Sequence, residues 1–397
     1  MRKKICIGDL GTIITGKTPS KTNKSYYGDD VAFIKPTDIS VDSKFTYETE
    51  EMYSKLAAEK YISSLIPKGA ICIPCIGTIG TKMTMTHCAC YTNQSINTII
   101  CNENYDNEYV YYLMKNFLPN LKSYNLGTAS GREFISKSNF EKIEIVAEQN
   151  KNIQKEIGKF LSRYDSLIEN YQKQIKLLEE SAQRLYKEWF VDLRFPGHEN
   201  VQIVDGVPKG WEKKPISQLG EYLNGFAFKP SDWQESGKPI IKIKEMGNGV
   251  SNDTPRNNGE RVPVKYLVKA GDLLFSWSAT LMVIVWSGEE GWLNQHLFKV
   301  TPAKGIGREF LLQSISNTIE EFQNLTTGST MKHIQRNKLD QVFVNVPDDE
   351  IMTSYSDLAE CMRNQILHLS SQIRLLTESR DRLLPKLMSG EIEVKIQ

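Results

Sequence analysis

The sequence has 397 residues, of which 40% are hydrophobic and 10% aromatic, and this is enough apolar material for roughly two to four packed domains. The composition therefore excludes an intrinsically disordered chain. Lys and Arg number 49 against 48 Asp and Glu, so the net charge of +1 gives no sign of a nucleic-acid partner. Binding to nucleic acid would have to use local basic patches.

No segment of the sequence is apolar enough to cross a membrane. The longest nearly apolar run, residues 281–286, is far shorter than the roughly 20 residues that a spanning helix needs. The start of the chain includes Asp9 and never builds the apolar core of a secretion signal. We therefore expect a cytoplasmic protein with no membrane partner.

The seven cysteines do not predict a disulfide framework, because their number is odd and six of them lie in about the first quarter of a long chain. Cys72 and Cys75, followed by His87, Cys88 and Cys90, have nearly the spacing of a zinc site. The run 70–76 has the composition of a β-strand, however, in which cysteine commonly behaves as a small buried hydrophobe. We expect no metal, and a zinc site is the alternative.

The sequence resembles itself at an offset of about 200 residues. Residues 7–16 match 216–225 at Ile, Leu and two glycines, and further matches follow in the same order through both halves. The strongest match lies between 174–185 and 372–383, where eight of twelve residues are identical. The chain therefore contains two copies of one unit.

Each copy has a globular part followed by a helical part. The globular part contains short β-type runs, in the first copy at 31–34, 71–73, 97–101 and 142–146, mixed with helical stretches. The helical part carries apolar side chains at alternating steps of four and three, which is the period of a coiled coil. These positions are Ile157, Leu161, Tyr164, Ile168, Tyr171, Ile175, Leu178, Ala182, Leu185 and Trp189 in the first copy, and Tyr355, Ala359, Met362, Ile366, Leu369, Ile373, Leu376, Arg380, Leu383 and Leu387 in the second. Arg380 is the one misfit.

These patterns predict the order of the domains. The order is a globular domain at 1–148, a central heptad helix at 149–194, a linker at 195–210, a second globular domain at 211–347 and a C-terminal heptad helix at 348–390. The sustained heptad period favours pairing of the two helices with each other. Either direction is sterically possible, and the symmetry of a repeated unit favours the antiparallel one. The predicted fold class is α+β, with two similar mixed α/β domains joined by two long helices that form an antiparallel coiled coil, in a pseudo-two-fold arrangement.

The sequence contains no recognisable catalytic constellation. It lacks the glycine-rich phosphate loops, the paired histidines of zinc proteases, the serine nucleophile elbow and the Asn/Asp-Pro-Pro-Tyr/Phe tetrapeptide of amino-group methyltransferases. Its five histidines are scattered without a partner at a useful spacing. We therefore expect no catalytic residues in this chain.

Several segments resemble one known family, the specificity subunit of type I restriction-modification systems. The opening of its first target-recognition domain is similar to residues 15–20, 26–28 and 33–39, and the opening of its second is similar to 224–228. Further segments that resemble the family lie at 67–70, 76–80, 92–95, 189–197 and 384–392. The resemblance covers essentially the whole chain, and the order of these motifs, the repeat and the two heptad helices together make it specific.

The resemblance implies a non-catalytic subunit that binds double-stranded DNA and reads a bipartite target. It also implies two methyltransferase subunits as partners, which methylate adenine, and restriction subunits, which cleave DNA. We expect no cofactor in this chain, with S-adenosylmethionine, ATP and Mg on the partner subunits. The alternatives are a diverged stand-alone DNA methyltransferase or nuclease, and a symmetric coiled-coil scaffold that binds only proteins.

The repeat separates two kinds of candidate DNA-binding residue, because residues identical in both halves cannot encode what differs between two half-targets. We assign the identical residues to scaffold or DNA-backbone positioning: Gly11, Gly16, Lys35, Asn93, Gln94, Thr128 and Ser130, with Gly220, Gly225, Lys242, Asn294, Gln295, Thr327 and Ser329. Base readout is expected where the halves diverge in residues that suit the DNA grooves. These candidates are Lys17, Ser20, Lys21, Asn23, Lys24 and Arg132, with Lys229, Ser231, Trp277, Ser278, Lys332, Gln335 and Arg336.

The helices are expected to carry the protein contacts. Apolar residues that lie off the heptad seam would be costly to leave in water, and we expect many of them to receive the methyltransferase subunits. These residues are Phe160, Leu167, Leu177, Phe190, Leu358, Leu367, Leu375 and Leu384.

Overall fold

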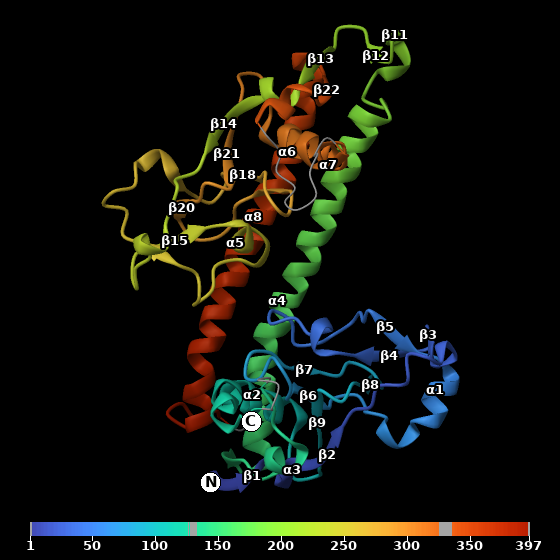
Figure 1. The fold of residues 1–397 in the computed structure, drawn as a ribbon, viewed down its shortest axis with the longest axis vertical. Coiled ribbons are helices and arrows are strands. Elements are labelled where there is room, and N and C mark those ends of the chain that lie inside the picture. The colour runs from blue at the N-terminus through green and yellow to red at the C-terminus, as the bar shows by residue number, and fades with distance from the viewer. Residues whose placement is uncertain (1, 126, 128–132, 325–335, 396–397) are drawn as a thin grey trace. The chain divides into compact units, whose positions relative to one another are not determined.

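The computed structural model describes residues 2–125, 127, 133–324 and 336–395. The chain forms two compact units that do not follow the chain order: unit 1 comprises 1–170 and 374–397, and unit 2 comprises 171–373. Two long helices, α4 (Lys151–Tyr186) and α8 (Asp349–Ser389), each contribute a segment to both units (Figure 1). Each unit is therefore one globular part packed on a segment of each long helix.

The described residues of unit 1 form three small sheets. Its strands are β1 (Arg2–Cys6), β2 (Gly11–Thr15), β3 (Tyr27–Gly28), β4 (Val31–Ile34), β5 (Glu51–Tyr53), β6 (Ile71–Pro74), β7 (Thr84–Met85), β8 (Tyr91–Thr92), β9 (Ile96–Cys101) and β10 (Glu144–Glu148). They form the sheets β1-β10, β2-β9-β6-β7 and β3-β5-β4-β8, in which β4 and β8 are parallel and the other pairs antiparallel. The predicted runs at 31–34, 71–73 and 97–101 are confirmed as β4, β6 and β9, and the run at 142–146 overlaps β10.

The short helices of unit 1 each contact a strand of these sheets, α1 at β5, α2 at β6 and α3 at β2. They are α1 (Lys55–Lys60), α2 (Asn107–Phe117) and α3 (Lys137–Glu141), with 3-10 helices at Ile7–Leu10, Lys24–Tyr26, Pro36–Asp38, Ile62–Ser64 and Leu118–Tyr124. Helix α2 begins at Asp106, whose carboxylate accepts a hydrogen bond from the Tyr109 amide at 3.0 Å and so caps the helix. The aromatic face of α2 then enters the core, because Tyr109, Tyr111 and Tyr112 are all buried.

Unit 2 has its own strands and helices. The strands are β11 (Ile203–Val204), β12 (Val207–Pro208), β13 (Glu212–Pro215), β14 (Gly220–Asn224), β15 (Lys238–Ile241), β16 (Arg256–Asn257), β17 (Leu267–Val268), β18 (Leu273–Ser276), β19 (Met282–Val285), β20 (Gly291–Leu293), β21 (Leu297–Pro302) and β22 (Phe343–Val346). The helices are α5 (Ile243–Asn248), α6 (Arg308–Asn317) and α7 (Ile319–Asn324), with 3-10 helices at His198–Asn200, Ile216–Gln218, Pro230–Asp232, Val264–Tyr266 and Arg336–Asp340 and a π-helical turn at Lys187–Val191.

Much of the strand pairing in unit 2 repeats that of unit 1, although the pair β11-β12 has no counterpart among the described residues of unit 1. The order β14-β21-β18-β19 corresponds to β2-β9-β6-β7, the pair β13-β22 to β1-β10, and the parallel pair β15 and β20 to β4 and β8. The register agrees as well, since Gly11 begins β2 opposite Cys101 and Gly220 begins β14 opposite Pro302. The internal repeat predicted from the sequence is therefore a repeat of topology.

The two long helices run antiparallel within each unit. In unit 1, Ile157 and Leu161 of α4 share a core with Leu384 and Leu387 of α8. In unit 2, Tyr186 at the end of α4 shares a core with Tyr355 and Ala359 near the start of α8. Numbers therefore rise along α4 as they fall along α8, which confirms the antiparallel direction, and every predicted heptad position is buried or half-buried.

Arg380, the one misfit of the heptad pattern, is buried and paired. Its guanidinium lies 2.5 Å from the buried carboxylate of Asp165 on α4, which also accepts a hydrogen bond from the hydroxyl of Tyr112. Asp381 contacts the guanidinium from the solvent side. The misfit is thus one half of an ion pair between the helices of unit 1.

The off-seam apolar residues of the helices fall into two groups. Phe160, Leu167, Leu177, Leu358 and Leu375 are exposed, as expected for a docking surface. Phe190 and Leu384 are buried instead, and Leu367 is half-buried. The expectation is therefore wrong for Phe190, which packs against Phe310 and Tyr355 in the core of unit 2, and for Leu384, which belongs to the core of unit 1. A globular part covers these positions, and the heptad pattern alone does not reveal it.

The structure also bears on membrane association. Within the described ranges, no helix is long and apolar enough to span a bilayer.

The buried ion pair generates a stability prediction. Arg380→Met removes the cation but keeps an apolar stem, so the Asp165 carboxylate stays buried without it, and we expect a loss of about 3–5 kcal/mol of unfolding free energy. Urea denaturation of the full chain measures this. Arg382→Ala breaks only the exposed pair with Glu378 and should cost less than about 1 kcal/mol. Adding Asp165→Leu to Arg380→Met should recover most of the loss, and a double variant no more stable than the single one would contradict the interpretation.

Candidate nucleic-acid interface

Two pairs of repeat-identical residues form the same joint in both units. A Cβ atom on Gly16 would lie 2.1 Å from the Thr92 carbonyl oxygen, and a Cβ atom on Gly225 would lie 2.1 Å from that of Asn294. The backbone amides next to these glycines also make equivalent hydrogen bonds: Asn93 donates to the Ile34 carbonyl and Asn294 donates to the Ile241 carbonyl, both at 3.1 Å. The close approach requires glycine, and it supports a scaffold role for these residues.

The loop that leaves the Gly16 joint carries the lysines predicted for base readout in unit 1. Lys17, Lys21 and Lys24 are exposed, and no acidic group among the described residues lies within ion-pair distance of them. Two tyrosine hydroxyls hold the backbone of this loop: Tyr53 donates to the Lys17 carbonyl at 2.6 Å, and Tyr27 donates to the Pro19 carbonyl at 2.9 Å. The loop is therefore a fixed platform for free ammonium groups, which suits contact with phosphates.

The other polar candidates of this loop are partly engaged within it. The Ser20 hydroxyl lies 2.7 Å from that of Thr22, and the Asn23 side chain accepts from the Ser25 amide at 3.2 Å as the cap of the 3-10 helix Lys24–Tyr26. Both residues are exposed. Their remaining donors and acceptors face solvent, where they could meet base edges.

The repeat-identical lysines have different surroundings in the two units. Lys35 lies 2.6 Å from Glu50 and 3.3 Å from Glu51, so its charge is compensated within unit 1. Lys242 instead lies 5.0 Å from the centre of the Trp233 ring. Trp233 is half exposed and was not among the sequence candidates; the only signal for it was a single tryptophan in a polar loop. Lys242 and Trp233 thus place a cation beside a half-exposed aromatic ring in unit 2.

The turn between β18 and β19 holds a second aromatic candidate in unit 2. The Trp277 indole donates to the Asn224 side chain at 3.2 Å, and its ring lies 5.8 Å from that of His296. Ser278 beside it is buried, so Trp277 offers the larger surface of the two. Ala279 has a φ of 58°, where the first copy has Gly77 with a φ of 81°. An alanine in this left-handed conformation is strained, and strained positions concentrate at functional turns.

A hollow of about 560 Å³ lies around the loop that carries Lys229 and Ser231. Both residues are exposed, and Phe226, Phe228 and Arg261 also line the hollow. The repeat-identical glutamines lie elsewhere: Thr18 donates to the Gln94 side chain, whereas the buried Oε1 of Gln295 has no hydrogen-bond partner within the described ranges.

Several sequence candidates cannot be placed. Thr128, Ser130, Arg132, Thr327, Ser329, Lys332 and Gln335 lie outside the described residues, and so does the side chain of Arg336.

Of the cysteines considered for a zinc site, Cys72, Cys75 and Cys90 are buried and Cys88 is exposed. Burial raises the pKa of Cys72 and of Cys75 to about 12, and raises that of Cys90 as well, so these thiols stay protonated. Metals bind thiolates. In the part of the chain that the structure describes, no three His, Cys, Asp or Glu residues are grouped so that they could hold a metal ion.

Comparison with known families identifies the chain. The model of the type I restriction modification DNA specificity domain matches residues 2–180 and again 208–365, which together make up most of the sequence. The chain belongs to this family.

Individual relatives agree with the family. The specificity subunit of the type I restriction enzyme MjaIX from Methanocaldococcus jannaschii is 27% identical over 98% of this chain and 93% of its own length. The HindI specificity subunit from Haemophilus influenzae is 36% identical over 44% of this chain and 38% of its own length. The crystal structure of a type I S subunit from M. genitalium aligns over 98% of this chain and 96% of that chain with a TM-score of 0.57 at 15% identity, so the fold is shared.

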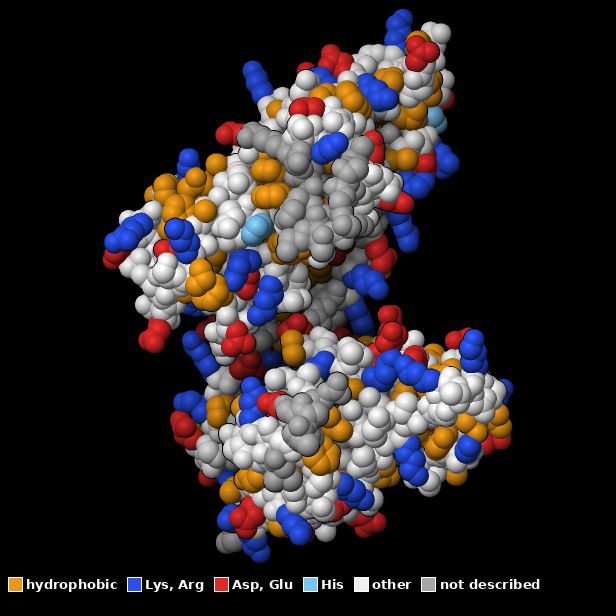
Figure 2. All heavy atoms as spheres, viewed as in Figure 1, with side chains coloured by type: hydrophobic (Ala, Val, Ile, Leu, Met, Phe, Trp, Pro, Cys, Tyr) orange, Lys and Arg blue, Asp and Glu red, His pale blue; other side chains and the backbone are white. Residues whose placement is uncertain are grey.

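The charges on the specificity subunit are mixed rather than concentrated. On the face drawn in Figure 2, Lys and Arg side chains alternate with Asp and Glu over the globular parts. This distribution agrees with the net charge of +1.

The glycine joints generate a prediction. Gly16→Ala and Gly225→Ala each force a Cβ atom onto a backbone carbonyl, and overpacking of this kind typically costs about 1–3 kcal/mol. Thermal unfolding should therefore shift downward in both variants. Gly247→Ala is the control, because its Cβ atom would meet only the end of the Met282 side chain at 3.7 Å. An equal melting temperature for all three variants would remove the explanation for these repeat-identical residues.

Proposed function

We propose that this chain is the DNA-reading subunit of a type I restriction-modification complex, and that each unit reads one half of a bipartite target. The observation that carries the proposal is the combination of one topology used twice with different exposed loops. The glycine joints and the order of the sheet that begins at each of Gly11 and Gly220 are the same in both units, whereas the adjoining loops carry three free lysines in unit 1 and two tryptophans in unit 2. Different loops on one scaffold suit an asymmetric target.

We place the chemistry of the complex on other subunits. The sequence has no recognisable catalytic motif, and the family is described as a DNA specificity domain. In this proposal two methyltransferase subunits supply S-adenosylmethionine, and restriction subunits supply ATP and Mg²⁺. Calorimetric titration of the isolated chain with S-adenosylmethionine would detect a stand-alone methyltransferase, which is the alternative.

The exposed apolar residues support two equal docking patches. In the repeat, Phe160 corresponds to Leu358 and Leu177 corresponds to Leu375. Unit 1 contains Phe160 and Leu375, unit 2 contains Leu358 and Leu177, and all four are exposed on the long helices. Each unit thus carries one member of both pairs. Two equivalent patches suit two copies of one partner, and we assign them to the methyltransferase subunits.

Independent readout predicts the outcome of a domain exchange. Residues 1–150 end just before α4, and replacing them with the equivalent region of a relative should change one half of the methylated sequence. The other half should stay the same because unit 2 is untouched. Single-molecule sequencing of adenine methylation in cells that carry the chimaera measures both halves. A change in both halves would rule out independent readout, and an unchanged pattern would place recognition outside unit 1.

The docking patches predict a loss of complex formation. Leu177→Glu and Leu375→Glu put a charge where a partner would bury an apolar side chain, and such substitutions typically cost at least about 2 kcal/mol of binding. Co-purification with the methyltransferase subunit should fall in both variants, with unchanged melting temperatures because both positions are exposed. Val264→Glu, at another exposed apolar residue of unit 2, should leave co-purification intact. Normal co-purification of both leucine variants would move docking onto the globular parts.

A further inference from the structure

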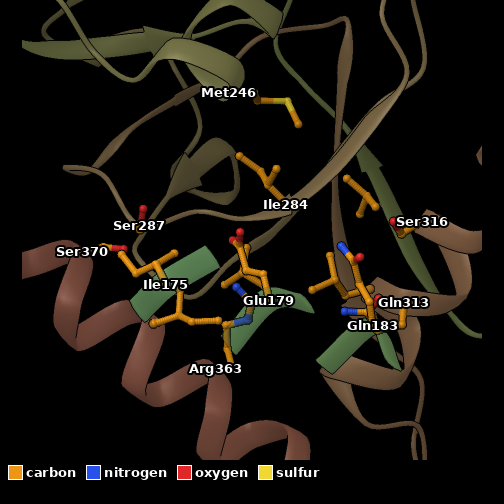
Figure 3. Close-up of a pocket in the computed structure, with 14 residues that line it drawn as sticks. Ile175, Glu179, Gln183, Met246, Ile284, Ser287, Gln313, Ser316, Arg363 and Ser370 are labelled. Atoms are coloured by element: carbon orange, nitrogen blue, oxygen red, sulfur yellow. The ribbon is translucent and has the colours of Figure 1, made fainter. Parts of the chain in front are cut away.

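Unit 2 contains a pocket for which the functions described above give no role. Its volume is about 410 Å³, within the range of about 300–1,000 Å³ that is typical of small-ligand sites. It lies between α4, α8, α6 and β19, with Met246 of α5 above it (Figure 3). The polar side chains in its wall are Glu179, Gln183, Gln313, Ser316 and Arg363, with Ser287 and Ser370 at one side.

The pocket exists because unit 2 has smaller residues where unit 1 is filled. Helices α2 and α6 are equivalent: Gly158 of α4 packs on the start of α2, and its repeat counterpart Ser356 packs on the start of α6. This equivalence pairs Tyr111, Tyr112 and Lys115 of unit 1 with Leu312, Gln313 and Ser316 of unit 2. The two tyrosines are buried in the core of unit 1, whereas the three smaller residues line the pocket.

In unit 1 a lysine lies beside the two tyrosines that take the place of the pocket residues. The buried ammonium of Lys44 pairs with Glu108 and lies 5.2 Å and 5.1 Å from the ring centres of Tyr111 and Tyr112. In unit 2 the counterpart of Glu108 is Glu309, which binds the guanidinium of Arg363 at 2.8 Å and 3.2 Å. Arg363 is the one cation among the described residues that line the pocket, and its charge is compensated by the carboxylate of Glu309.

This arrangement leaves the carboxylate of Glu179 without a direct partner. Figure 3 shows it among the lining residues, with Met246 and Ile284 on one side and Arg363 on the other. No ion pair or hydrogen bond joins Glu179 to another described residue. Glu179 is an exposed residue, so a cation can reach its carboxylate from solvent, and partial desolvation raises the pKa of this carboxylate, an effect that Arg363 partly offsets.

We propose that the pocket is a binding site for an organic cation, an alkylammonium or guanidinium group on an aliphatic stem, which Glu179 holds by charge. The amides of Gln183 and Gln313 supply acceptor oxygens for the remaining N–H groups. Ile175, Val283, Ile284, Val285, Leu312 and Ile366 form an apolar wall for the stem. A polar head with an apolar stem is the shape of a free diamine and equally of a Lys or Arg side chain from another protein.

The first arm of the test uses the full chain and agmatine, which carries a guanidinium and an ammonium on a four-carbon stem. Calorimetric titration should detect binding, with N-butylurea as a neutral analogue that binds at least about tenfold more weakly. Glu179→Gln should weaken agmatine binding by about tenfold or more, whereas Asp357→Asn, at an exposed acid of α8, should not change it. Gln313→Tyr and Ser316→Lys restore residues of unit 1, and both should abolish binding by filling the pocket. Melting temperatures check that each variant is folded.

The second arm distinguishes the source of the cation, and it rests on the proposed function. If a partner supplies the side chain, Glu179→Gln should lower the affinity of the chain for the methyltransferase subunit by about tenfold, and agmatine should compete with that subunit. If the ligand is a free amine, agmatine binds but subunit affinity is unchanged. Failure of agmatine to bind better than butylurea, together with unchanged subunit affinity of Glu179→Gln, would overturn the assignment. The first arm involves neither DNA nor a partner, so its result is separate from that of the proposed function.

Discussion

A buried charged side chain must meet an opposite charge, because an unpaired buried ion costs several kcal/mol, and in each unit this constraint fixes which residue packs against α8. In unit 1 the constraint is met by Asp165 and Arg380. In unit 2 it is met by Glu309 of α6 and Arg363 of α8. Apolar heptad positions would tolerate several registers of α4 against α8, whereas the pair of Asp165 with Arg380 tolerates one, and the pair of Glu309 with Arg363 sets the place of α6 on α8. The globular parts therefore sit at defined positions along the helices of their own units.

The ion pairs also explain why two units of one topology have different interiors. Asp165 and Arg363 are repeat counterparts with opposite charges. Asp165 draws in Arg380 and the hydroxyl of Tyr112, so α2 carries a large polar aromatic residue at that point. Arg363 draws in Glu309, which leaves Gln313 in place of the tyrosine and opens the pocket beside Glu179. One exchange of charge between the copies is thus accompanied by a change from a filled core to a hollow.

The sequence predicts the features of this chain that depend on local periodicity. The heptad positions and the strands β4, β6 and β9 follow from the type and spacing of residues along short stretches, and the repeat follows from identical residues at an offset of about 200. Arg380 was predictable only as a misfit, because its partner Asp165 lies 215 residues away and off the seam. Phe190 and Leu384 were assigned to the surface since a heptad analysis sees one helix face and not the globular part that covers another. The sequence alone does not distinguish the unpaired lysines at 17–24 from Lys35, because the difference lies in the folded positions of Glu50 and Glu51, which pair with Lys35.

The same charges bear on which helix segments can pair at all. Asp165 faces Arg380, and the repeat counterpart of Arg380 is Ala182. An antiparallel pair of two α4 segments in this register would set Asp165 against Ala182 and leave a buried carboxylate without its cation. A pair of two α8 segments would set Arg363 against Arg380, two like charges in a desolvated interface. Pairing of α4 with α8 gives Asp165 its cation and keeps Arg380 away from Arg363, whose partner is Glu309 of α6. The two halves of the repeat have therefore diverged in the buried charges of their helices as well as in their loops. This divergence favours pairing of α4 with α8 over pairing of either helix with a second copy of itself.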